Sequence, residues 1–419
     1  MRSSLSLTGS PRRKGLTRSV IALLAWAVVL WLPAGGVAGP SQLKLTFGAR
    51  QEYNDNIFFN TDDKKADFIT TGIFTVDLGH VAERLEMHAI GHWEGYTYWT
   101  NSNLNDVDQD YRLSLAYRLT PRIRGALSGA YLQDYHRDQE TVETGVVFGN
   151  EKRTRYEMQS EWEFLLSEVT AVNISAIYWQ DQYDQITASQ EGGHNLKTYG
   201  GALGLTRALR VFQRPTYGRV NLGCYRYEYE DSDTDNFYLN IGFSTEIDET
   251  FTLLLDIGPR YTESEYTVLD STVGNLYTIA AKETSRDWGG GGRLSIKYVG
   301  EKTDWVAALD REIAASSGQN QVVERTEARF DWRHWFTWEC RGLLTLHYFI
   351  NESSKSYRNT SDINEDTFVV YPRIFYRFSP NFSIQASYNY TWQKDNEGSS
   401  ITERNQFLIE ATYNWSMWE

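Results

Sequence analysis

Residues 107–119 read VDQDYRLSLAYRL, and their alternation decides the fold of the chain. Apart from Gln109, apolar and aromatic side chains occupy every second position, and polar or small side chains fill the positions between them. A period of two is that of a β-strand, whose successive side chains point to opposite faces of the sheet. Soluble strands are commonly about five or six residues long, whereas a strand that crosses a bilayer at a tilt needs about nine to eleven. The length of this alternation therefore predicts a membrane-spanning strand.

The same alternation returns along the chain, for example in residues 236–247 and 382–393. In each of these stretches an apolar set and a polar set keep to opposite faces. Beyond residue 38, no apolar run approaches the roughly 20 residues that a membrane-spanning helix needs. The chain is thus predicted to be all-β, with no separate soluble domain.

The connections between the predicted strands fall into two alternating sets. Short turns are predicted at residues 120–121, 166–168, 248–249, 300–302, 336–337 and 379–381. Longer polar loops are predicted at residues 54–66, 100–106, 138–151, 182–194, 263–284, 316–323, 352–365 and 394–403. Outer-membrane barrels have short periplasmic turns and longer outer loops. The sequence therefore predicts a transmembrane antiparallel up-and-down β-barrel of about 18 strands with both termini periplasmic, or of 16 strands if one hairpin is misread.

The N-terminal residues 1–38 are predicted to be a signal peptide, which leaves residues 39–419 as the barrel. Four basic residues, Arg12, Arg13, Lys14 and Arg18, precede the apolar run 20–32, and Gly36-Val37-Ala38 supplies the small residues of a cleavage site. The remaining composition agrees with a barrel: mean hydropathy is −0.51 although aromatic residues make up 14% of the chain. Transmembrane barrels gather aromatic side chains in girdles at both membrane interfaces.

The charge of the chain bears on its partners. Removing residues 1–38 takes five of the 41 Lys and Arg and none of the 55 Asp and Glu, so the net charge falls from −14 to −19. This acidic balance argues against binding to nucleic acid. On the outer surface, acidic loops are expected to meet lipopolysaccharide through divalent cations, and the barrel wall is expected to meet outer-membrane lipid.

The inward-facing side chains are where function is expected, because a basic side chain facing lipid at the midplane costs about 2–4 kcal/mol. The predicted cationic lining of the lumen is Arg112, Arg118, Arg122, Arg124, Arg155, Arg293, Arg325, Arg329 and Arg333. One interpretation is that these arginines form ion pairs that hold the wall together. Another is that they guide an anionic chain, since a guanidinium binds carboxylate or phosphate through two parallel hydrogen bonds. The sequence leaves both open.

Two aromatic residues share the inward-facing positions. Trp179 is in phase with Asn173, Ser175 and Asp181, and Tyr238 lies between Asn236 and Asn240. Aromatic rings stack on the apolar faces of sugars, so these side chains suit a saccharide path. They equally suit an interfacial girdle.

Other motifs do not predict chemistry. The run Gly289 to Gly292 lacks the Lys-Ser/Thr and the helix of a phosphate loop, and a bend or dent in the wall is expected there instead. Asp231, Asp233 and Asp235 begin like a calcium loop but lack its turn glycine and closing glutamate. His88 and His92 are four residues apart on one strand, about 13 Å at 3.3 Å per residue, too far to share a metal. No catalytic Ser-His-Asp set is evident, so neither an enzyme nor a cofactor is expected.

Residues 52–58 read EYNDNIF, just after the first predicted strand. This stretch is similar to the opening of a family of outer-membrane β-barrel porins associated with exopolysaccharide synthesis and export loci. The resemblance implies an outer-membrane pore or secretion barrel with a polysaccharide cargo, working with periplasmic or inner-membrane export machinery. Composition and periodicity by themselves point to the barrel and not to its cargo.

Two alternative functions stay open. A general diffusion porin for small solutes needs a loop folded into the lumen, and residues 263–284 are the only predicted loop long enough. A structural or assembly barrel would instead have a lumen plugged by its own salt bridges.

Overall fold

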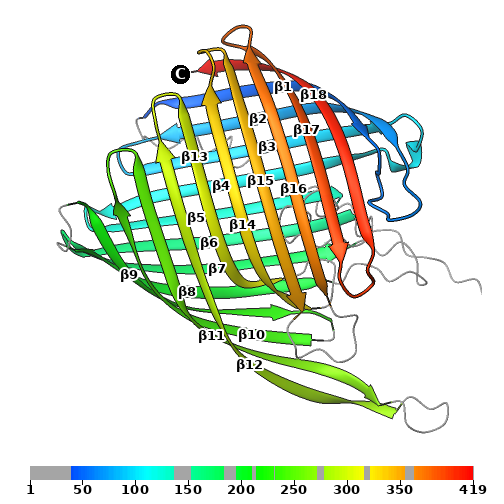
Figure 1. The fold of residues 1–419 in the computed structure, drawn as a ribbon. Helices are drawn as coiled ribbons and strands as arrows, with labels where there is room; N and C mark the ends of the chain where they lie inside the picture. Colours follow the sequence, from blue (N-terminus) through cyan, green and yellow to red (C-terminus); the bar gives the residue numbers. More distant parts are fainter. Residues whose placement is uncertain are drawn as a thin grey trace, which may run out of the picture. The chain divides into compact units, whose positions relative to one another are not determined.

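The computed structural model forms a closed antiparallel β-barrel of 18 strands (Figure 1). The structure describes residues 39–135, 152–183, 195–209, 214–230, 232–270, 278–315, 321–353 and 363–418, so the predicted signal peptide lies outside the described residues. The strands are β1 (Ser41–Asn54), β2 (Asp67–Val81), β3 (Leu85–Tyr98), β4 (Asp106–Thr120), β5 (Ile123–Tyr135), β6 (Lys152–Ser167), β7 (Thr170–Tyr183), β8 (Leu196–Leu209), β9 (Thr216–Glu228), β10 (Ser232–Glu246), β11 (Phe251–Asp270), β12 (Thr278–Val299), β13 (Thr303–Ala315), β14 (Val322–Trp335), β15 (Cys340–Ser353), β16 (Asn364–Arg377), β17 (Phe382–Asp395) and β18 (Ile401–Trp418). A single turn of 3₁₀ helix, η1 (Ser102–Leu104), precedes β4.

Each strand pairs with the next one along the chain, and β1 pairs with β18 to close the barrel. This topology confirms the predicted up-and-down barrel and its count of 18 strands. We call the end that holds the start of β1 and the end of β18 the turn end, and the opposite end the loop end. The short predicted turns all fall at the turn end, which faces the periplasm in barrels of this kind.

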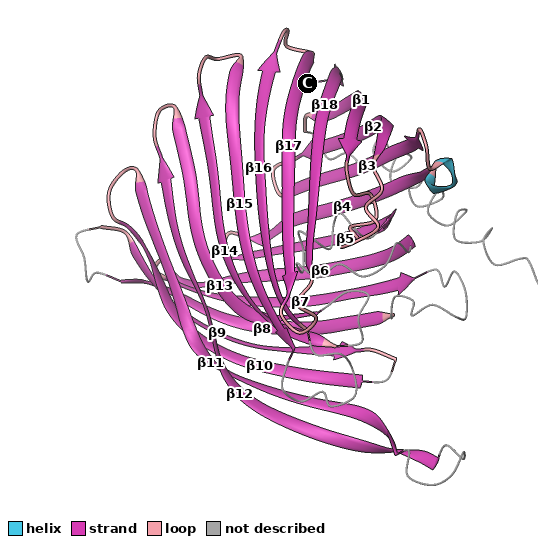
Figure 2. Ribbon diagram, turned by 45° about the vertical axis from the view of Figure 1, so that its right-hand side comes forward, coloured by secondary structure: helices cyan, strands magenta, loops and turns pink. Residues whose placement is uncertain are grey.

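The alternation of the sequence sorts side chains between the two faces of the wall. Large apolar side chains such as Ile241, Ile257 and Ile409 lie exposed on the outer face. Their polar neighbours in sequence point into the lumen. In the described part of the chain, no helix is long and apolar enough to cross a membrane, a finding that does not concern strands. Figure 2 shows that strands make up nearly all of the described structure.

One predicted loop is wrong in its extent. Residues 263–284 were expected to connect two strands, but β11 continues to Asp270 and β12 begins at Thr278. The two strands form a hairpin that projects past its neighbours (Figure 1). Residues 262–265 read TESE, four polar residues in a row, and this break in the alternation resembles the composition of a loop. Most of the expected constriction loop is therefore wall.

Candidate functional site: the lumen wall

A cavity of about 990 Å³ lies in the lumen, bounded by side chains from β3 to β13. Its wall includes the predicted aromatic residues Trp179 and Tyr238, together with Tyr225. The rings of Tyr225 and Tyr238 stack with centroids 5.9 Å apart and planes 10° from parallel. Both predicted aromatic residues thus line the cavity, where the side chains of neighbouring strands can reach a solute together.

Amide and guanidinium groups surround these rings. Asn221, Asn236 and Asn240 contribute amides to the cavity wall, and Arg112, Arg155 and Arg293 contribute guanidinium groups. Rigid aromatic surface with a few placed polar groups is typical of small-molecule sites. The sequence predicted the three arginines and two of the rings, whereas Tyr225 was missed, although its position in the alternation of β9 could have indicated it.

Arg112, Arg155 and Arg293 are ion-paired with carboxylates on the same or a neighbouring strand. The Nε of Arg155 donates to Asp181 at 2.6 Å, and that of Arg293 lies 2.8 Å from a carboxylate oxygen of Asp310. Arg112 lies 2.9 Å from Asp110 and remains more than half exposed. This arrangement favours the interpretation that ion pairs hold the wall together, while the exposed guanidinium groups keep donors available to a solute.

Four more predicted arginines also have acidic neighbours. Arg325 and Arg329 lie 3.1 Å and 2.8 Å from Glu327 and Asp331, the acidic residues two positions along the same strand. The other two pairs cross between strands, Arg124 with Glu163 at 3.8 Å and Arg333 with Asp304.

The two remaining predicted arginines lie at the turn end. Arg118 is on β4, and Arg122 lies in the turn between β4 and β5 rather than on a strand. Among the described residues, neither has a carboxylate within 4.0 Å. All of the predicted arginines on strands occupy inward-facing positions, but they do not form one continuous unpaired track.

The loop-end half of the lumen is closely packed. The guanidinium group of Arg153 is fully buried and donates to both carboxylate oxygens of Asp134, at 3.1 and 3.0 Å. Arg325 is also buried, with its guanidinium 4.1 Å from the centre of the Phe349 ring. Polar side chains at the loop ends of most strands show the same burial. At these positions the inner face is withdrawn from solvent.

This packing includes contacts across the lumen. Leu196 and Tyr227, from the inner faces of β8 and β9, form one buried cluster with Ile313 and Val322, from β13 and β14. Beyond the end of β9, Tyr229 donates its hydroxyl to the backbone oxygen of Gln321 at 2.7 Å. Neither β8 nor β9 is adjacent to β13 or β14 in the sheet. The loop ends of β13 and β14 therefore lean onto the opposite wall, where they lie over the green strands in Figure 1.

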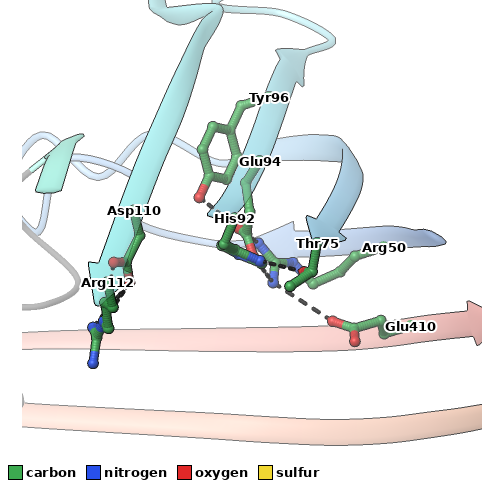
Figure 3. Close-up of polar contacts among 8 residues, drawn as sticks. All are labelled: Arg50, Thr75, His92, Glu94, Tyr96, Asp110, Arg112 and Glu410. Atoms are coloured by element: carbon green, nitrogen blue, oxygen red, sulfur yellow. Dashed lines mark hydrogen bonds and ion pairs between the residues drawn. The ribbon is translucent and has the colours of Figure 1, made fainter. Parts of the chain in front are cut away.

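A group of inward-facing polar side chains ties three strands together where β1 pairs with β18 (Figure 3). Arg50 of β1 donates to Glu94 of β3 at 2.6 Å and lies 3.6 Å from Glu410 of β18. Glu94 also accepts a hydrogen bond from the hydroxyl of Tyr96 at 2.6 Å, and His92 lies 3.2 Å from it. Because these contacts bridge β18, β1 and β3, we assign this group to closure of the wall.

The histidines and aspartates that were considered as metal ligands have other partners. His88 lies 2.6 Å from Asp77, on the neighbouring strand, and not with His92. Asp233 and Asp235 both pair with Arg226, at 3.0 and 3.3 Å, whereas Asp231 lies outside the described residues. Within the described ranges, no group of three or more His, Cys, Asp or Glu side chains is placed to hold a metal ion.

The EYNDNIF stretch, residues 52–58, holds the connection between β1 and β2 against β18. The side chain of Asp55 accepts hydrogen bonds from the backbone N–H and the side-chain amide of Asn405, both at 2.7 Å. Asn56 is fully buried and donates to the backbone oxygens of Asn60 and Glu403 at 2.8 and 2.9 Å. These residues hold the β1–β2 connection onto β18. The stretch that carries the family resemblance is thus structural and does not line the cavity.

No protein-family model and no curated protein matches the chain. Solved structures with a similar fold include the ferric citrate transporter FecA, at 11% identity and a TM-score of 0.48 over 85% of this chain and 60% of FecA. OpdK of Pseudomonas aeruginosa, solved with vanillate, is 11% identical with a TM-score of 0.43 over 89% of this chain and 98% of its own. The siderophore receptor PiuA of Acinetobacter baumannii is 10% identical with a TM-score of 0.48 over 89% and 82%.

The chain therefore spans less than two thirds of the length of FecA. The assignment of the fold rests on the strand pairing of the chain itself.

Proposed function

We propose that this chain is an outer-membrane pore that conducts an exopolysaccharide, in particular an anionic one, and works with export machinery of the periplasm or inner membrane. The observation that carries this proposal is the composition of the lumen cavity, in which Trp179, Tyr225 and Tyr238 lie among amides and guanidinium groups. Rings offer stacking surface to a sugar, amides bond its hydroxyl groups, and guanidinium groups bind its carboxylates. The resemblance of residues 52–58 to exopolysaccharide-associated porins supports the same cargo.

The test is block of single-channel current by an anionic oligosaccharide in planar bilayers. Trp179→Ala and Tyr238→Ala should each weaken the block about 5- to 30-fold, since well-packed aromatic residues at binding surfaces commonly contribute about 1–2 kcal/mol or more. Trp162→Ala is the matched control, because Trp162 lies exposed on β6 and does not line the cavity. An open current without block, or equal effects of all three variants, would remove the support for a saccharide path.

A plugged barrel is the second candidate, and the packing of the loop-end half favours it. Buried ion pairs and the cluster across the lumen occupy that half of the described structure. The distinguishing result is the absence of any current from refolded protein whose folding has been verified. A general porin is less well supported, because most of residues 263–284 are wall rather than a loop available to narrow the lumen.

A further inference from the structure

The barrel wall is incompletely joined between β12 and β13. These strands pair from Val299 and Asp304 only as far as Gly292 and Arg311. Beyond that point, the described part of β12 pairs only with β11, and β13 pairs only with β14. The other neighbouring strands remain paired close to their loop ends. An unpaired strand edge is unusual in a barrel, where closure otherwise satisfies every backbone group.

We call the unpaired stretch between β12 and β13 the seam. Packing across the lumen keeps the two strands apart at this seam. Ile313 would pair with Gly290 if the register of β12 and β13 continued beyond Gly292 and Arg311. Instead, Ile313 is buried against Leu196 and Tyr227 on the opposite wall. The separation of β12 from β13 is thus stabilised by a hydrophobic cluster, which replaces the missing strand pairing.

Two cavities meet the wall where the pairing of β12 with β13 ends. A second cavity, of about 520 Å³, shares Gly291, Gly292, Arg293 and Arg311 with the lumen cavity. The rest of its wall is mainly apolar and comes from the outward-facing side chains of β11, β12 and β13: Leu255, Ile257, Leu294 and Leu309. Gly290 also lines this second cavity, and a Cβ atom added at Gly290 would meet no atom within 4 Å, whereas one added at Gly289 would meet the guanidinium group of Arg260. A polar lumen and a lipid-facing apolar surface therefore meet at this seam.

The side chain of Arg260 is a buried cation next to the glycine run of β12. Arg260 of β11 is 3% exposed and lines the lumen cavity, with its guanidinium group close against Gly289. Its Nη2 donates to Glu324 at 3.0 Å, but its buried Nε and Nη1 atoms have no hydrogen-bond partner in the described structure. Arg311 pairs with the same Glu324, so that two guanidinium groups share one carboxylate.

Four carboxylates line the cavity, and among the described residues none of them pairs with Arg260: Asp310 lies 2.8 Å from Arg293 and Glu157 lies 3.6 Å from Arg155. Asp256 pairs with Arg219 at 2.8 Å, and Glu312 lies on the opposite face of β13 from Arg311. Buried N–H groups without acceptors are costly, because they lose their water without gaining a partner. The unpartnered donors of Arg260 point to an anionic group of a ligand.

We propose that the break between β12 and β13 is a lateral opening for an acylated anion of the outer leaflet. Its phosphate or carboxylate binds Arg260 inside the wall, and its acyl chain lies outside against Leu255, Ile257, Leu294 and Leu309. The proposal shares the lumen cavity with the proposed function but does not require polysaccharide to pass. It adds an amphiphilic ligand and a route between the lumen and the membrane.

A photoreactive dodecyl phosphate carrying a diazirine in its alkyl chain tests this opening. Barrels refolded in phosphatidylcholine vesicles are labelled, and labelling of β11–β13 is divided by labelling of β16–β17 in the same molecule, which corrects for general contact with lipid. The wild-type ratio should be well above one. Gly290→Phe fills the seam, and Arg260→Gln removes the cation, so each should lower the ratio at least fivefold.

Gly72→Phe is the matched control, because Gly72 on β2 also has no atom within 4 Å of an added Cβ. Heat-dependent gel mobility verifies that each variant has folded, and Gly290→Phe keeps the test valid if Arg260→Gln does not. Uniform labelling around the wild-type barrel, or an unchanged ratio in folded Gly290→Phe, would overturn the proposal. Loss of oligosaccharide block with intact seam labelling would instead reject the polysaccharide function alone.

Discussion

The two halves of the lumen wall are built from the same strands but differ in how deeply their charged side chains are buried. At the loop end, Arg153 is fully buried in a bidentate ion pair with Asp134. Towards the turn end, the side chains of Arg124 and Glu163 are 56% and 38% exposed and their charged atoms lie 3.8 Å apart. Both arginines occupy inward-facing positions on neighbouring strands. Alternation thus fixes the direction of a side chain, whereas its burial depends on which distant strands pack over it.

This difference matters for function because burial changes what an arginine can do. A buried guanidinium with its donors satisfied holds strands together, whereas an exposed one can exchange its partner for a solute. The loop-end half therefore acts mainly as packed structure, into which the lumen cavity extends as far as Leu196 and Tyr227, and the turn-end half acts as accessible wall. The predictions below test this division, beginning with the largest expected effect.

Removing a carboxylate should have very different consequences in the two halves. Asp134→Asn should lower the free energy of unfolding by about 3–5 kcal/mol, because it removes the negative charge that pairs through two hydrogen bonds with the buried guanidinium group of Arg153. Glu163→Gln, which breaks the exposed pair with Arg124, should lower it by about 0–1 kcal/mol. Urea unfolding of the barrel in lipid vesicles, followed by tryptophan fluorescence, measures both. Similar losses in the two variants would contradict the division.

The contact across the lumen should restrict the pore. Tyr229→Phe removes the hydrogen bond to the backbone of Gln321, which contributes about 0.5–1.5 kcal/mol, so the ratio of open to closed channels should rise roughly 2- to 12-fold. Tyr217→Phe is the control, because Tyr217 lies exposed near the turn end of β9. Single-channel recording gives the ratio directly. An unchanged ratio in Tyr229→Phe would show that this contact does not limit conduction.

The smallest effect is expected at the turn end, in the connection between β10 and β11. The pKa of Asp248 is lowered because its carboxylate accepts hydrogen bonds from the hydroxyl and backbone N–H of Thr250 and from the backbone N–H of Phe251. A lowered pKa in the folded state stabilises the fold above the pKa of the unfolded state, and this contribution is lost as the pH falls through the folded pKa.

Asp248→Ala should therefore lower the urea midpoint slightly at pH 7, and the difference from wild type should shrink in acid. Glu249→Ala changes the neighbouring exposed carboxylate and should leave the midpoint nearly unchanged. A deficit of Asp248→Ala that persists unchanged in acid would show that the charge of Asp248 does not matter.

Local patterns predict the barrel well because membrane strands must alternate along their whole length. The 18 strands, their order and the inward positions of Arg155, Trp179 and Tyr238 all follow from a period of two. The hairpin of β11 and β12 was mistaken for a loop, since polar strands that project beyond the membrane have loop-like composition. The glycine run 289–292 does predict a bend or dent in the wall, and the pairing of β12 with β13 ends there.

Contacts between distant strands cannot be read in the same way. The cluster of Leu196, Tyr227 and Ile313 depends on how the wall bends across the lumen, and no local period encodes that bend. Arg260 appeared as one more charged residue of a strand, although its burial and its unpartnered donors depend on β12 and β14. The EYNDNIF stretch likewise holds its loop in place through hydrogen bonds to Asn405 of β18, which is far away in the sequence.

The most direct test of the central claim, a pore with an accessible turn-end wall and a packed loop-end half, is the sidedness of block in planar bilayers. Barrels inserted in one orientation are exposed to an anionic oligosaccharide from one side at a time. The account predicts block of the single-channel current when the oligosaccharide is added at the turn end, and little or none when the same concentration is added at the loop end. Equal block from both sides, or from neither, would contradict it.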